Sequence, residues 1–153
     1  MKKAYEELYE DVLDEVGAIE ETLKRLHKIR KSFDPQTTDH CIEPAMGTYL
    51  MNFYNGIENI LKRISKEYYK KIPSGESWHK ELLVLSYSRP GGKSPILNRN
   101  IVERLHQYRG FRHRFVSGYG FQLSGEKMLE LIDNVAPLWN DIKKAIADFW
   151  DTL

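Results

Sequence analysis

The sequence has little that would form a disulfide, bind zinc or cross a membrane. Cys41 is its only cysteine, so no intramolecular disulfide can form, and no group of cysteines and histidines has the spacing of a zinc site. No apolar run approaches the roughly 18 residues that a membrane span needs. The opening residues, MKKAYEELYEDVLDE, turn acidic where a secretory signal would be apolar. We therefore expect a cytoplasmic protein with no metal site and no membrane partner.

The usual signatures of cofactor and hydrolase chemistry are missing as well. The chain has no phosphate-binding loop, no dinucleotide fingerprint and no GxSxG motif, so we expect no cofactor. It also lacks the alternating apolar pattern that predicts β-strands. A length of 153 residues suits one core, and we expect a single domain over residues 1–153.

Amphipathic helical patterns fill most of the chain instead. Apolar residues recur at spacings of three and four, which is the period of a helix with one buried face. The predicted helices cover residues 4–32, 44–71, 78–87 and 96–118, and a last one follows Ser124. Proline and glycine clusters, above all SRPGGKSP at 88–95, separate them. The pattern predicts an all-α fold, an up-and-down antiparallel four-helix bundle with an extra short helix.

Three local features carry predictions of their own. Gly56 lies in mid-helix, where glycine costs about 1 kcal/mol relative to alanine, and a close helix–helix contact would explain it. Ser94 and Pro95 are suited to the N-cap and the first position of the helix predicted over 96–118. Pro137 predicts a kink or a break in the last helix.

The charge is unevenly distributed, although the net charge of the whole chain is only +1. Between Leu82 and Gly125 the single acid is Glu103, and the basic residues are Arg89, Lys93, Arg99, Arg104, Arg109, Arg112 and Arg114. A segregated basic region favours a polyanion or an acidic partner surface. Charge alone leaves an alternative equally open, in which the acidic first helix neutralises this region on folding.

The basic residues are densest in LHQYRGFRHRFVSGYG, residues 105–120. Arg109, Arg112 and His113 are spaced so that they share one helical face, where like charges repel each other. A guanidinium holds phosphate through paired donors, and metal-free RNA cleavage needs only a proton-moving group and a stabiliser of the phosphorane charge. Arginine and histidine can supply both, with Arg109 and Arg114 as further phosphate contacts.

Arginine-rich helical faces are common, so this pattern has a structural alternative. Arg109 and Arg112 would then pair with acids of the same chain, such as Asp14 or Glu15. A second histidine of interest, His79, follows Trp78 at a helix start and is most simply a surface or capping residue.

The segment FRHRFVSGYGFQL resembles the motif region of HEPN domains, in particular the HepT-like members encoded beside a minimal nucleotidyltransferase. FYNGIENILKRI (53–64), GESWHKELL (75–83) and the helix after YGF are similar to further segments of that group, so the likeness covers about residues 5–150. It implies a helical bundle that forms a homodimer through the motif helix. It also implies a toxin component with metal-independent endoribonuclease activity on RNA.

The motif of that family is an arginine, four to six further residues and a histidine, often followed by X-Tyr. Arg112 matches the arginine and Tyr119 the tyrosine, but Ser117 stands at the histidine position. A serine hydroxyl does not titrate near neutrality and cannot replace imidazole as acid or base. Either His113 supplies the imidazole, or Arg112 and hydroxyl groups act slowly without one, or the domain binds RNA or its partner without cleavage.

The resemblance also implies a partner, the cognate nucleotidyltransferase that serves as the antitoxin. In such pairs it neutralises the toxin by adding AMP to the motif tyrosine, which corresponds here to Tyr119. Gly118 and Gly120 flank this tyrosine and would leave its ring accessible, whereas packing against Phe121 is the structural alternative. The other functional hypothesis is a non-catalytic module, either the substrate-binding or regulatory partner of a nucleotidyltransferase or an RNA-binding bundle.

Overall fold

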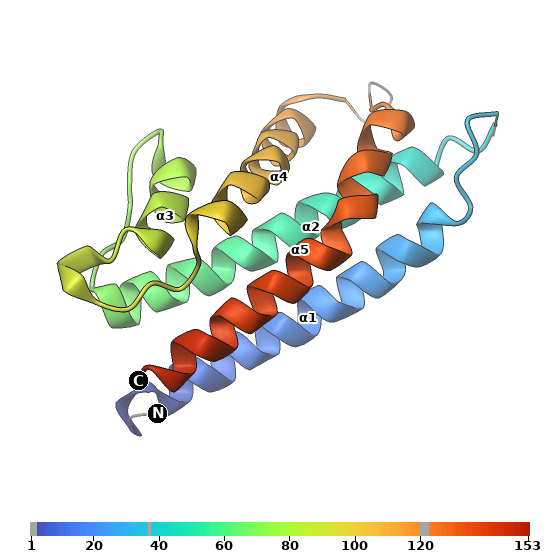
Figure 1. Cartoon of the computed structure of the whole chain (residues 1–153). Coiled ribbons are helices and arrows are strands. Elements are labelled where there is room, and N and C mark those ends of the chain that lie inside the picture. The colour runs from blue at the N-terminus through green and yellow to red at the C-terminus, as the bar shows by residue number, and fades with distance from the viewer. Residues whose placement is uncertain (1–2, 37, 120–122) are drawn as a thin grey trace.

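The computed structural model describes residues 3–36, 38–119 and 123–153, and over these ranges it contains helices and connections but no strand. The long helices are α1 (Glu6–Arg30), α2 (Ile42–Ile64), α4 (Arg99–Ser117) and α5 (Gly125–Asp151), and α3 (Trp78–Tyr87) is short. Short non-α turns are η1 (Lys3–Tyr5), the π-helical η2 (Ser65–Tyr69) and η3 (Pro90–Gly92). The predicted all-α bundle with an extra short helix is confirmed (Figure 1).

The second helix lies at the centre of the bundle and contacts α1, α3, α4 and α5 (Figure 1). Its contact with α1 is very close at Gly56, where an added Cβ would lie 2.6 Å from Cγ1 of Ile19. That confirms the close helix–helix contact expected from the sequence. A side chain at position 56 would have to displace Ile19, which is only 1% exposed. Among the helices of the described residues, none is both long and apolar enough to span a bilayer.

The start of α4 differs from the prediction. The helix begins at Arg99, and its N-cap is Asn98, whose side chain accepts a hydrogen bond from the Ile101 N–H at 2.9 Å. The preceding Ile96 and Leu97 are buried, and both of their N–H groups donate to the carbonyl of Ser86 at the end of α3. The prediction that Ser94 and Pro95 start this helix is therefore wrong, because the chain first pairs with α3.

The end of α2 also differs from the predicted helix over 44–71. The α-helix ends at Ile64, continues as the π-helical η2, and stops at Lys70, which has a left-handed backbone (φ 58°). The 88–95 loop is fastened to this end by two hydrogen bonds. The Tyr69 hydroxyl donates to the Ser94 carbonyl, and Lys93 Nζ donates to the Tyr68 carbonyl, both at 2.6 Å. The Lys93 ammonium group thus helps to hold the 88–95 loop on the end of α2.

The last helix begins as predicted, with the Ser124 side chain accepting from the Lys127 N–H at 3.4 Å. It continues through Pro137 without a break, and its axis bends within its first half (Figure 1). Its buried face, which includes Val135, Trp139 and Phe149, closes the core against the other helices.

The Gly56 contact makes a stability prediction. Gly56→Ala gains about 1 kcal/mol of helix propensity, but overpacking against Ile19 costs about 1–3 kcal/mol, so we expect net destabilisation. In an Ile19→Ala background the obstacle is gone, and the same change should stabilise the fold by about 1 kcal/mol. Urea unfolding of the four proteins in this double-mutant cycle measures both effects. A Gly56→Ala change with the same effect in both backgrounds would contradict the close contact.

Candidate functional site

The motif helix α4 is held in place by its apolar side. Leu105, Tyr108 and Phe111 are buried, and the Tyr108 hydroxyl donates a hydrogen bond to the Leu131 carbonyl of α5 at 2.6 Å. Near its end, Phe115 packs on Gly47 of α2, where an added Cβ would lie 2.8 Å from the ring. Val116, the next residue, is 55% exposed. These contacts fix the rotation of α4 and hence the direction of its arginines.

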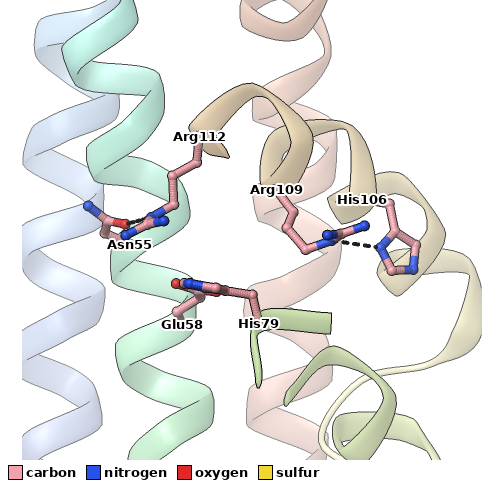
Figure 2. A network of polar contacts seen from close by, with 6 residues as sticks. All are labelled: Asn55, Glu58, His79, His106, Arg109 and Arg112. Carbon is pink, nitrogen blue, oxygen red and sulfur yellow. Dashed lines mark hydrogen bonds and ion pairs between the residues drawn. The ribbon is translucent and has the colours of Figure 1, made fainter. Parts of the chain in front are cut away.

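The Arg112 side chain reaches α2 and is oriented there by a neutral group. Its Nε donates to Oδ1 of Asn55 at 2.6 Å, and both side chains are half-buried (Figure 2). An amide fixes the position of the guanidinium but does not neutralise its charge.

The Arg109 side chain is oriented in the same way by a neighbour on its own helix. Its Nε donates to Nδ1 of His106 at 3.3 Å, which requires an imidazole without a proton on that nitrogen (Figure 2). Burial lowers the pKa of His106, and the positive charges of Arg109 and Lys80 lower it further against the opposing effect of Glu103. The imidazole is therefore kept neutral beside the guanidinium.

Neither guanidinium has a carboxylate partner in the described part of the chain, and no ion pair there involves Arg114. No described residue accepts a hydrogen bond from the Nη groups of Arg109 and Arg112, and none of these atoms is sealed from solvent. The alternative of salt bridges to Asp14 or Glu15 is wrong, because no ion pair of the described residues joins either acid to Arg109 or Arg112, and Glu15 lies 4.0 Å from Arg63 of α2 instead. Both arginines thus present their Nη donors to solvent.

A buried acid lies next to this pair and is occupied by a histidine. Glu58 of α2 is 2% exposed, and its Oε2 lies 2.6 Å from Nδ1 of His79 on α3 (Figure 2). Burial raises the pKa of the Tyr54 hydroxyl; the charge of Glu58 raises it further, whereas Arg109 and Arg112 lower it. The carboxylate and the two guanidiniums therefore act on one buried hydroxyl with opposite effects on its pKa.

Sequence reasoning missed Asn55, Glu58 and the role of His79. The prediction that His79 is a surface or capping residue is wrong. Its Nδ1 lies 2.6 Å from Glu58 of α2, its side chain is 25% exposed, and its ring stacks on that of Trp78 with the centroids 3.5 Å apart. One signal was present in the sequence. Glu58 lies in the apolar stripe of α2, directly after Ile57, and a carboxylate at such a position needs a partner.

The remaining predicted residues lie toward the end of α4. His113, Arg114, Ser117 and Tyr119 are exposed, and the Ser117 hydroxyl donates to the His113 carbonyl at 2.8 Å. Arg114 and Tyr119 line a pocket of about 320 Å³ between the end of α4 and the start of α5, together with Lys127 and an apolar floor. Gly120 and Phe121 lie outside the described residues, so the predicted packing of Tyr119 on Phe121 stays a prediction.

The environment of His106 makes a prediction about its titration. We expect a pKa below the ordinary 6.5, and a value closer to 6.5 in Arg109→Gln, because removing the guanidinium removes charge repulsion while burial remains. Since the unfolded chain binds the proton more readily, the contribution of His106 to stability is complete above about pH 6.5 and is lost as the pH falls. NMR titration measures the value, with Arg114→Gln as control. Titration of His106 at or above 6.5 in the wild type would contradict this environment.

Comparison with known proteins adds a family to this geometry. The sequence model of a family described as "HepT-like protein" matches residues 45–153. The match runs from the first turn of α2 to the C-terminus and includes every residue of the Asn55, Glu58, His79, His106, Arg109 and Arg112 network. No curated protein and no solved structure matches the chain. The family match covers well over half of the sequence, and the chain belongs to the HepT-like family.

Proposed function

We propose that the chain is the toxin component of a toxin–antitoxin pair and cleaves RNA in the cytoplasm as a metal-independent endoribonuclease. Family membership supports this proposal, because HepT-like proteins are usually part of such a pair. The observation that carries it is the pair Arg109 and Arg112, each held through Nε by a neutral acceptor with its Nη groups open to solvent.

The arrangement suits a phosphodiester for two physical reasons. Fixing Nε in a hydrogen bond removes side-chain freedom before an anion arrives, so less ordering is needed on binding. Partial burial lowers the effective dielectric constant, so the uncompensated charges attract a phosphate more strongly than fully exposed ones would. In the transition state the same donors stabilise the negative charge that develops on the phosphorane oxygens.

The remaining motif residues have distinct places in the proposal. Arg112 is the principal catalytic residue, Arg109 and Arg114 contact further phosphates of the RNA, and Tyr119 binds RNA and receives AMP. Because the Ser117 hydroxyl is bonded to a backbone carbonyl, it orients the end of the helix and does not move protons. We further propose a homodimer through α4, whose end exposes the apolar Val116.

Cleavage of RNA in the presence of EDTA tests the proposal. Wild-type protein should cleave tRNA or mRNA, and Arg112→Ala should lower the rate by about 100-fold or more, as loss of one charge-stabilising donor does in other enzymes. Arg104→Ala is the matched control, since Arg104 lies on the same helix but pairs with Asp141 at 2.6 Å. No cleavage by the wild type, or equal cleavage by wild type and Arg112→Ala, would reject the enzyme.

A second candidate function is the non-catalytic module, favoured by the serine at the motif histidine position and by the bonded state of its hydroxyl. In that case the chain binds RNA, or a nucleotidyltransferase as its substrate-binding or regulatory partner.

Mixing the chain with ATP and the nucleotidyltransferase encoded beside its gene separates the two candidates. For the toxin we expect AMP on Tyr119 by mass spectrometry and loss of RNA cleavage, whereas Tyr119→Phe stays unmodified and its cleavage does not respond to the nucleotidyltransferase and ATP. A stable complex with no cleavage, no toxicity on expression and an unmodified Tyr119 would favour the module instead.

A further inference from the structure

We propose that His79, oriented by the buried carboxylate of Glu58, is the acid–base group that acts on the phosphodiester held by Arg109 and Arg112. This inference rests on the proposed ribonuclease function and supplies the imidazole that Ser117 cannot. It assigns the chemistry to a residue of α3, outside the motif helix.

The geometry of the pair is that of an oriented general base. Oε2 of Glu58 lies 2.6 Å from Nδ1 of His79, the Glu58 side chain is 3% exposed and the His79 side chain 25%. A carboxylate at Nδ1 holds the proton on that nitrogen, leaves the lone pair on Nε2, and stabilises the imidazolium once Nε2 has taken a proton. The buried Glu58 carboxylate thus orients the ring, and the imidazole is the partly exposed member of the pair.

Two residues of α2 bring this imidazole to the arginines. Asn55 and Glu58 are three residues apart on one face of the helix, where Cβ atoms lie roughly 5–6 Å from each other. Asn55 holds Arg112 at 2.6 Å and Glu58 holds His79 at 2.6 Å. Figure 2 shows the Glu58–His79 pair below the side chains of Arg109 and Arg112, which come from α4. One helical face therefore positions a phosphate-binding group and a proton-accepting group as neighbours.

The other two imidazoles near the motif are less suited to the role. His106 accepts the Arg109 hydrogen bond on Nδ1, so its proton is on Nε2 and it has no lone pair left to take a proton. His113 is exposed, and the hydrogen bond it makes is through its backbone carbonyl. Neither ring has a carboxylate that would stabilise its protonated form within salt-bridge distance among the described residues.

A purely structural role would have the pair do no more than fasten α3 to α2. Burying a carboxylate for that purpose is costly, and apolar residues of similar volume usually serve as well or better. The α2–α3 contact also has a second fastening, because Lys62 Nζ of α2 lies 4.8 Å from the centre of the Trp78 ring. The experiment below separates the structural role from the catalytic one.

The proposed step conserves atoms and charge. Nε2 of His79 takes the proton of a ribose 2′-hydroxyl, the 2′ oxygen forms a bond to phosphorus, and the bond from phosphorus to the 5′ oxygen breaks. The departing 5′ oxygen takes a proton from water, and the imidazolium later returns its own proton to solvent. The products are a 2′,3′-cyclic phosphate and a 5′-hydroxyl. Arg109 and Arg112 hold the phosphoryl oxygens throughout.

The test uses two substitutions of the same imidazole. His79→Asn places an amide nitrogen near the position of Nδ1 and keeps a donor for Glu58, whereas His79→Gln reaches the position of Nε2 with a group that does not titrate. Both should bind 2′-O-methyl RNA like the wild type, and both should lose cleavage by about 100-fold or more. Added imidazole should restore part of the cleavage by His79→Gly. His40→Asn, at an exposed imidazole outside the motif helix, is the control and should cleave normally.

A pH–rate profile provides the readout for Glu58 as a positioning residue. Glu58 of α2 pairs with His79, and Lys62 of α2 lies over the ring of the adjacent Trp78. Arg109 and Arg112 of α4 are drawn near the pair in Figure 2. Glu58→Gln keeps the shape and an acceptor but removes the negative charge. We expect slower cleavage and an acidic limb displaced to lower pH, because the imidazolium loses its carboxylate. A merely structural pair would leave the limb in place.

The outcomes distinguish this inference from the proposed function. If Arg112→Ala abolishes cleavage while His79→Asn and Glu58→Gln cleave like the wild type, the ribonuclease stands and the role of His79 is overturned. If the wild type cleaves no RNA, both are overturned. If circular dichroism shows that the His79 variants do not fold, the test is the pH–rate profile of Glu58→Gln. An acidic limb of that profile at the same pH as in the wild type overturns the inference.

Discussion

Hydrogen bonds from two arginine Nε groups to neutral acceptors are the interactions on which the site depends. Asn55 holds Arg112 and His106 holds Arg109, and neither acceptor cancels the charge that it positions. A carboxylate in either place would have produced an ordinary salt bridge. The outcome is a pair of fixed guanidiniums whose Nη donors reach solvent, and this arrangement is stable only because the bundle fixes the rotation of α4 against α2.

The fold keeps acids away from these arginines by using them elsewhere. On α1, Asp11 and Glu15 face Arg63, and Glu20 pairs with Lys143 of α5 at 3.0 Å. The alternative in which the acidic first helix neutralises the basic region fails for Arg109, Arg112 and Arg114 in the described chain. Glu58 lies near the cluster (Figure 2), and its carboxylate pairs with His79. Charge that is segregated in the sequence therefore stays segregated where phosphate would bind.

The sequence was sufficient for the helices because each one must bury a periodic apolar face, whatever its neighbours are. The predicted start of α4 was wrong because it depends on hydrogen bonds to a distant segment. The Ser86 carbonyl accepts hydrogen bonds from the N–H groups of Ile96 and Leu97, so the helix begins after these residues. The arginines were predictable from their density along one helix. Their neutral partners were not, because Asn55 and Arg112 are 57 residues apart and no local pattern connects them. The roles of His113, Ser117 and Tyr119 stay predictions.

The central claim is that Arg109 and Arg112 are a phosphate site, and the salt dependence of binding tests it most directly. Single-stranded 2′-O-methyl RNA is titrated at several salt concentrations against the wild type, the Arg109→Gln/Arg112→Gln double variant and an Arg104→Gln control. Each phosphate contact on a single strand contributes about 0.7 to the slope of log K against log salt, so the double variant should lose about 1.4. The control should keep the wild-type slope. Equal affinity and equal slope for the double variant and the wild type would contradict the account.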